Sequence, residues 1–263
     1  MMDCCPNKCY NADNFDSREN LENYFSDKPN MVLGEDSLKF PLENLSKTFK
    51  EGNINGDILI DISPSAMIHH LFAACEFFKY IIVLKMRDRC ILELKRWVDS
   101  RTGAFSWGHA AKLQADIGES SDPLQDKEVK VRSALQHVVK YNLEKENITD
   151  PIVLPPGDCI ISTWLLDVIC QNGDDYVRYL KKFSKLLKPE GHVILIGVLD
   201  ATYFIVGKEK FHYFTYNEDF ARKALVEAGF LIDRCVVKKR TVVCDLIDHK
   251  AVIFIAAHKA KSE

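Results

Sequence analysis

The sequence has no excess of charge of one sign and no long apolar run. Its 35 Lys and Arg residues nearly balance its 38 Asp and Glu residues, for a formal net charge of −3. Proteins that bind nucleic acid mainly through the phosphates carry a clear positive excess, so we expect no nucleic-acid partner. The longest apolar runs, 193–199 and 251–257, are far shorter than the roughly 20 residues that a transmembrane helix needs. We therefore expect no membrane span.

The N-terminal stretch also lacks the apolar segment of a secretory signal. The number of cysteines, nine, is odd, and five of them lie in or beside apolar segments, as is typical of reduced thiols that pack as small hydrophobic side chains: Cys75, Cys90, Cys159, Cys170 and Cys235. These features predict a cytoplasmic protein. Cys4, Cys5 and Cys9 cluster near the start of the chain, but no Cys or His pair at zinc-binding spacing follows them, so we expect no metal site.

Strand and helix patterns alternate along the chain. Short apolar runs bounded by turn residues predict buried strands at 57–62, 81–84, 158–163, 192–199, 231–237 and 251–257. Apolar residues spaced three and four apart predict two helices within 18–50 and further helices at 65–78, 88–98, 124–140, 174–187 and 217–228.

This alternation predicts an α/β fold with a doubly wound, mainly parallel sheet. The last two strands end in charged residues and are expected to form an antiparallel pair at the edge of the sheet. Such a sheet binds ligands in a crevice at the carboxyl ends of its strands, here after Ile62, Leu84, Thr163 and Leu199.

The loop after the first strand has no glycine. It reads Ser63, Pro64, Ser65 and Ala66, where a nucleotide-binding crevice normally has glycine so that the backbone can approach the ligand. Glycine is scarce throughout, with 12 residues in 263, about two-thirds of average usage. From these residues alone, the loop is a strand-to-helix turn with Ser63 as the helix N-cap and Pro64 as the first helical residue.

The stretch LIDISPSAMIHHLFAAC at 59–75 resembles the signature of the nicotinamide, phenylethanolamine and indolethylamine N-methyltransferases, which reads LIDIGSGPT before a helix ending in Ala and Cys. Further segments resemble this family at the same spacing: RENLENYF at 18–25, LPPGDCIIST at 154–163, LLKPEGHVILIGVL at 186–199 and EAGF at 227–230. The resemblance implies one domain over 1–263, with a seven-stranded Rossmann-like methyltransferase sheet, an antiparallel edge strand, a helical lid over 18–50 and a flexible tail over 1–17. It also implies a monomer and S-adenosylmethionine (SAM) as cofactor.

The resemblance assigns seven positions to the cofactor: Tyr24, Asp61, Ser63, His69, Lys85, Asn142 and Thr163. Ser63, His69, Lys85 and Asn142 depart from the family pattern. Ser63 and Ser65 replace glycines, and each added Cβ narrows the space for the methionine part of SAM. Lys85 replaces the acid that accepts hydrogen bonds from both ribose hydroxyls, which an ammonium cannot do. This loss predicts that SAM binding is weaker by about 2–4 kcal/mol, or roughly 30- to 800-fold.

Two carboxylates are candidates for the methyl acceptor. The resemblance places Asp167 and Asp200 at the acceptor pocket, where they would attract a protonated amine and one would take its proton before methyl transfer. The alternative for each is a helix cap or a loop acid. Gly197 and Phe204 replace an acid and a tyrosine of the pyridine-using member, which argues against nicotinamide as acceptor.

Two functions remain open on this sequence. The first is SAM-dependent N-methylation of a small amine by in-line displacement, with the protein supplying orientation and exclusion of water. The second is a catalytically silent relative that binds an amine or aromatic molecule in the same crevice, because the cofactor pocket is degenerate. A third reading, that Lys85 marks a phosphorylated ligand, rests on that residue alone.

Overall fold

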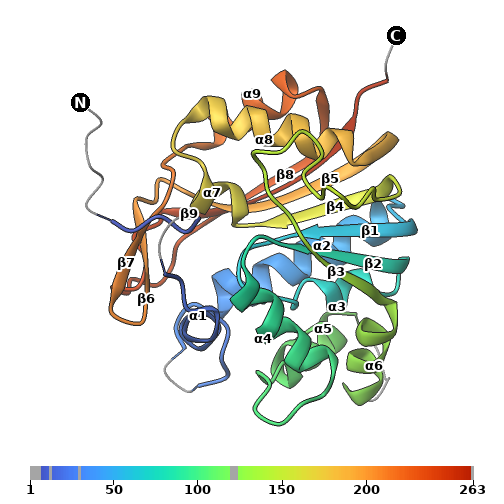
Figure 1. The fold of residues 1–263 in the computed structure, drawn as a ribbon. Coiled ribbons are helices and arrows are strands. Elements are labelled where there is room, and N and C mark those ends of the chain that lie inside the picture. The colour runs from blue at the N-terminus through green and yellow to red at the C-terminus, as the bar shows by residue number, and fades with distance from the viewer. Residues whose placement is uncertain (1–6, 12–13, 29–30, 119–123, 262–263) are drawn as a thin grey trace.

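A seven-stranded sheet forms the centre of the molecule (Figure 1). The computed structural model describes residues 7–11, 14–28, 31–118 and 124–261, so Cys4 and Cys5 lie outside the described residues. The strand order is β3-β2-β1-β4-β5-β9-β8. The strands span Gly56–Ile62 (β1), Phe78–Lys85 (β2), Leu135–Lys140 (β3), Gly157–Thr163 (β4), Leu187–Leu199 (β5), Phe230–Lys239 (β8) and Ala251–Lys259 (β9).

The sheet is parallel except for one strand. β1 pairs in parallel with β2 and β4, β2 with β3, and β4 with β5, whereas β9 runs antiparallel to both β5 and β8. The central strands are apolar along their length because both faces are covered, and Leu59, Ile60 and Ile62 are fully buried. The expected doubly wound, mainly parallel sheet with an antiparallel pair at its edge is confirmed.

Helices cover both faces of the sheet. In Figure 1, α8 and α9 lie above the sheet and α3, α5 and α6 lie below it, and α2 contacts α3 and α5. Asn172 and Asn217 begin α8 and α9, because each side chain accepts a hydrogen bond from a backbone N–H of the first turn. The helices span Phe40–Glu51 (α2), Leu71–Ala74 (α3), Asp88–Val98 (α4), Gly108–Gly118 (α5), Leu124–Ala134 (α6), Leu165–Ile169 (α7), Gly173–Lys185 (α8) and Glu218–Glu227 (α9).

Two predicted helices are wrong in part. Only Leu71–Ala74 of the helix expected at 65–78 is α-helical, because Ser65 adopts a left-handed φ of 55° and residues 64–70 are largely turns. The helix expected at 124–140 ends at Ala134, and residues 135–140 form β3. Pairing with β2 overrides the helical spacing there, and the β-branched Val138 and Val139 suit a strand.

The N-terminal part of the chain lies across the carboxyl end of the sheet. Helix α1 (Ser17–Tyr24), capped by Asp16, contacts α4 on one side and the hairpin strand β6 (Tyr203–Val206) on the other. β6 pairs with β7 (Glu209–His212) in an antiparallel hairpin, and the π-helix η1 (Glu35–Lys39) leads into α2. Of the lid expected over 18–50, α1 covers the crevice, whereas α2 belongs to the helical layer.

Some of the residues in the segment 1–17, which was expected to be a flexible tail, pack against the body of the protein. Within its described residues, Tyr10 and Phe15 are 1% exposed and their rings pack edge to face. Lys8 forms an isolated bridge to Phe211 of β7. These contacts hold Lys8, Tyr10 and Phe15 against the body of the protein. Among the described helices, none is long and apolar enough to cross a membrane.

Candidate functional site

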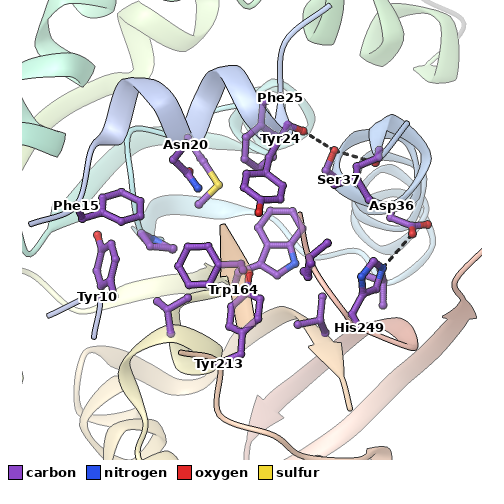
Figure 2. A pocket seen from close by; sticks show the side chains of 18 residues that line it. Tyr10, Phe15, Asn20, Tyr24, Phe25, Asp36, Ser37, Trp164, Tyr213 and His249 are labelled. Carbon is purple, nitrogen blue, oxygen red and sulfur yellow. Dashed lines mark hydrogen bonds and ion pairs between the residues drawn. The ribbon is translucent and has the colours of Figure 1, made fainter. Parts of the chain in front are cut away.

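A narrow cavity lies beneath α1 at the carboxyl ends of β1, β4 and β5 (Figure 2). The cavity has a volume of about 60 Å³. This position, between the two strands at which the chain reverses its direction of winding, is where doubly wound sheets bind ligands. The walls are mostly aromatic and aliphatic, and the lining includes Tyr10, Phe15, Asn20, Tyr24, Phe25, Asp36, Pro64, Met67, Trp164, Val198, Tyr213 and His249.

A buried hydrogen-bond network joins β1 to β2 next to this cavity. Asp61 accepts hydrogen bonds at Oδ1 from His70 Nε2 (2.8 Å) and from Ser63 Oγ (2.6 Å). Its Oδ2 accepts from Lys85 Nζ at 3.2 Å. Burial by itself would raise the pKa of Asp61, but the Lys85 ammonium, His70 and Ser63 together lower that pKa below its ordinary value. Asp61 is therefore a carboxylate whose charge is balanced inside the protein.

Lys85 is turned inward, toward β1. Its ammonium also donates to the backbone carbonyl of Ser63 at 2.9 Å, and the side chain is 1% exposed. Next to it, Cys90 is fully buried, with Sγ 3.8 Å from the hydroxyl of Tyr10. The position at which the resemblance expects a ribose-binding acid is thus occupied by an internal ion pair.

The glycine-free loop is closed by contacts from the N-terminal segment. The backbone N–H of Ser65 donates to the Tyr10 hydroxyl at 3.1 Å, and the Ser65 and Ser17 hydroxyls are 2.9 Å apart. The Ser63 hydroxyl accepts from the backbone N–H of Thr163 at 3.2 Å while it donates to Asp61. Both serine side chains therefore take part in the folded structure of the loop.

His69 lies in an aromatic box beside the cavity. Its ring stacks on Phe25 at 5.0 Å and contacts Trp107 and Trp164 at 5.9 and 5.8 Å between centroids. Burial, with a smaller contribution from His70, lowers the pKa of His69 well below its ordinary value, so the ring is neutral. Neither ring nitrogen has a hydrogen-bond partner among the described residues.

The other predicted cofactor residues differ in their solvent exposure. Thr163 is fully buried, and its hydroxyl has no partner among the described residues. Tyr24 lines the cavity, but its hydroxyl lies 2.8 Å from each of the carbonyl oxygens of Ile205 and Leu246, between which it shares its single proton. Asn142 is exposed, and its side-chain oxygen caps the backbone N–H of Glu144. Asn142 therefore does not join the cavity.

The two carboxylates expected to bind the methyl acceptor lie apart from the cavity beneath α1. Asp167 is buried behind Gly197, and its Oδ1 accepts from the N–H of Val198 (2.8 Å) and the hydroxyl of Tyr216 (3.0 Å). Burial raises the pKa of Asp167 to about 7. Asp200 is exposed in a left-handed turn, φ 53°, and neither carboxylate lines the cavity beneath α1.

Sequence reasoning missed an acid and a histidine that line the cavity. Oδ2 of Asp36, in η1, lies 3.1 Å from Nε2 of His249, just before β9. The two side chains lie together at the right of Figure 2. Asp36 and His249 are both buried, and their side chains are 7% and 2% exposed. They are 213 positions apart in the chain, and no motif links them. Only the packing of η1 beside the start of β9 brings them together.

The sheet order and the cavity at its carboxyl ends define the SAM-dependent methyltransferase fold. A SAM-dependent methyltransferase from Clostridium acetobutylicum has a similar structure, with a TM-score of 0.56 and 12% identity over 87% of this chain and 95% of that chain.

A model of the NNMT/PNMT/TEMT family matches residues 6–260, and the chain belongs to this family. It is 31% identical to the indolethylamine N-methyltransferase of Oryctolagus cuniculus, over 92% of each chain. It is 30% identical to the nicotinamide N-methyltransferase of Homo sapiens, over 93% of each chain. Family and fold support a SAM-dependent N-methyltransferase with SAM as its cofactor, as the resemblance predicted.

The residues of this chain do not fit SAM in the way expected from the family. A ribose needs acceptors for its hydroxyls, and Lys85 offers only an ammonium that is already bound by Asp61 and Ser63. The Ser65 N–H is held by Tyr10.

Proposed function

We propose that this chain binds a small, mostly apolar molecule in the cavity beneath α1 and does not hold SAM as an active N-methyltransferase would. The observation that carries this proposal is the buried ion pair of Lys85 and Asp61, with side chains 1% and 0% exposed. Lys85 stands where the resemblance expects an acid, whose negative charge could accept hydrogen bonds from ribose. The change weakens donor binding by about 2–4 kcal/mol, or roughly 30- to 800-fold, before the cost of moving Tyr10 is added.

The apolar cavity supports the ligand-binding half of the proposal. Aromatic and aliphatic walls with a few convergent polar groups are typical of small-molecule sites. The cavity lies beneath α1, and Lys85 is not among its lining residues. The cytoplasmic location and the monomeric state stay predictions.

An active amine N-methyltransferase is the second candidate. It is favoured by family membership and by three buried side chains near the ends of β1, β3 and β4 whose polar atoms have no partner among the described residues: His69, Tyr141 and Thr163. Buried polar atoms are normally hydrogen-bonded to protein, water or ligand. A donor that entered after the N-terminal segment opened could satisfy them.

Titration calorimetry with SAM separates the two candidates. The proposal expects no binding below millimolar concentration for the natural chain. The triple variant Ser63→Gly, Ser65→Gly, Lys85→Asp should bind at least tenfold more tightly than the natural chain. Lys140→Asp is the matched control, because Lys140 lies beside Lys85 in the sheet register but its side chain is 58% exposed.

Micromolar binding of SAM by the natural chain would contradict the proposal and favour the enzyme. Transfer of a labelled methyl group to an aromatic amine would do the same. Equal responses of the triple variant and the Lys140 control would show that the loop and Lys85 are not the cause of weak binding.

A further inference from the structure

Three polar side chains that line the cavity have no hydrogen-bond partner in the described part of the chain. Asn20 of α1, Trp164 after β4 and Tyr213 after β7 are 7%, 8% and 7% exposed. No described residue hydrogen-bonds to the Asn20 amide, the Trp164 indole N–H or the Tyr213 hydroxyl, and unlike the enclosed polar atoms of His69 and Thr163 these groups keep accessible surface. In Figure 2, Asn20 and Tyr213 point into the cavity from opposite sides. Largely buried polar groups of this kind normally bind water or a ligand.

All three of these groups can donate a hydrogen bond. The indole N–H only donates, whereas the side-chain amide and the phenol hydroxyl both donate and accept. A ligand that offers an acceptor oxygen therefore suits each of them. The Ser37 hydroxyl in the same wall is already used, because it lies 2.8 and 3.0 Å from the carbonyl oxygens of Tyr24 and Leu33.

The charged groups of the cavity wall are already paired. Asp36 accepts hydrogen bonds from Lys238 Nζ at 2.8 Å and from His249 Nε2 at 3.1 Å. Among the described residues, no other Asp, Glu, Lys or Arg lines the cavity. A charged ligand would find no unpaired opposite charge here, and burying an unpaired charge is costly. The cavity therefore suits an uncharged molecule.

Trp164 limits the size of the cavity. Its backbone is left-handed, with φ 53°, and it begins α7 without a side-chain cap, so two local preferences are given up at this position. Such departures are typical of residues whose side chain serves a site. The indole packs against Phe25 and His69, at 5.7 and 5.8 Å between centroids. The remaining 60 Å³ has room for about two to four nonhydrogen atoms, at roughly 15–30 Å³ each.

We propose that the cavity binds an uncharged alcohol or carbonyl compound of about two to four nonhydrogen atoms, whose oxygen accepts a hydrogen bond from the Asn20 amide. Tyr213 offers a second donor from the opposite side, and Trp164 excludes molecules as large as an aromatic ring. The inference rests on the proposed function and adds the class of ligand. The Asp167 and Asp200 carboxylates have no part in it.

Ethanol and propane form the test, because they differ only by a hydroxyl in place of a methyl group. NMR titration of the full chain, labelled with ¹⁵N and without SAM, reports binding through the indole N–H resonance of Trp164. The resonance of Trp97, a buried residue of α4 that does not line the cavity, is the internal reference. Both probes should shift the Trp164 resonance and leave that of Trp97 in place.

Asn20→Leu keeps the shape of the side chain and removes its polar atoms. The ratio of the ethanol affinity to the propane affinity should fall at least tenfold in this variant. Asn23→Leu is the matched control, since Asn23 belongs to the same helix but does not line the cavity, and it should keep the natural ratio. If Asn20→Leu does not fold, Tyr213→Phe, which loses only a hydroxyl, should lower the same ratio.

Trp164→Gly tests the size limit. Glycine adopts a positive φ without strain, and the space of the lost indole joins the cavity, which should then exceed the roughly 150 Å³ that holds a benzene ring. In calorimetry this variant should bind phenol, more tightly than toluene, and the natural chain should bind neither. The double variant Asn20→Leu, Trp164→Gly should bind phenol and toluene equally. Binding of phenol by the natural chain as tightly as by Trp164→Gly would overturn the size limit.

The outcomes with ethanol and propane separate the two proposals. The same affinity ratio in the natural chain and in Asn20→Leu would mean that the amide holds only water, which overturns the assignment of Asn20 while leaving a ligand cavity. If neither probe shifts the Trp164 resonance, the ligand-binding function itself fails, whatever the result with SAM.

Discussion

Replacing Lys85 by Met tests the buried ion pair directly. The ammonium lies 3.2 Å from Asp61 Oδ2, and the two side chains are 1% and 0% exposed. Met has a similar length but no charge, so Asp61 would remain as a buried carboxylate with only His70 and Ser63 as partners. Breaking a buried pair in this way costs about 3–5 kcal/mol. That is a large share of the roughly 5–15 kcal/mol by which a typical domain is stable.

Urea unfolding at pH 7 measures this loss. A decrease of that size corresponds to a shift of the midpoint by roughly 1–2 M. The difference between variant and natural chain should narrow as the pH falls from about 7 toward 4, because Asp61 without its cation takes up a proton more readily and loses its unpaired charge.

Two further variants serve as controls for this measurement. The double variant Asp61→Asn, Lys85→Met has no buried charge and should recover most of the lost stability. Lys79→Met removes an exposed ion pair with Asp57, whose side chains are 72% and 55% exposed, and should leave the midpoint unchanged. A loss in Lys85→Met as small as that in Lys79→Met would refute the buried pair and the argument against SAM that depends on it.

Three other perturbations have defined outcomes. Burial raises the pKa of Asp167 to about 7, so the folded state binds a proton that the unfolded state has released. The free energy of unfolding should therefore fall by about 2–3 kcal/mol between pH 5 and 8. Asp167→Asn should lack this decrease when unfolded with urea, and parallel pH profiles of the variant and the natural chain would contradict the prediction. In Gly56→Ala the new Cβ would lie 2.4 Å from Asp158 Cγ and displace a carboxylate that accepts hydrogen bonds from two backbone N–H groups. Thermal unfolding should show that the variant is less stable by about 1–3 kcal/mol. An unchanged melting temperature would count against this geometry. Ser65→Gly should be more stable than Ser65→Ala by about 1 kcal/mol, because both lose the hydroxyl but only glycine relieves the φ of 55°; equal stability would argue against the left-handed turn.

Much of the fold follows from local patterns in the sequence. A continuous apolar run such as 193–199 is typical of a strand that is covered on both faces, and it forms the second half of β5. Helix starts are equally local, because Asn172 and Asn217 each satisfy a backbone N–H three residues ahead. The strand β3 could not be predicted in this way, since its residues have helical spacing and become a strand only beside β2.

The candidate site shows the same division. The sequence alone determined that glycine is missing from the first loop and that a lysine stands where an acid is expected, because these are facts of residue type. Only the tertiary structure decided that Lys85 turns inward to Asp61, that Asp167 is enclosed by Tyr216, and that Asp36 meets His249 across 213 positions. Side-chain direction and long-range pairing depend on how helices pack across the sheet, and no local pattern carries that information.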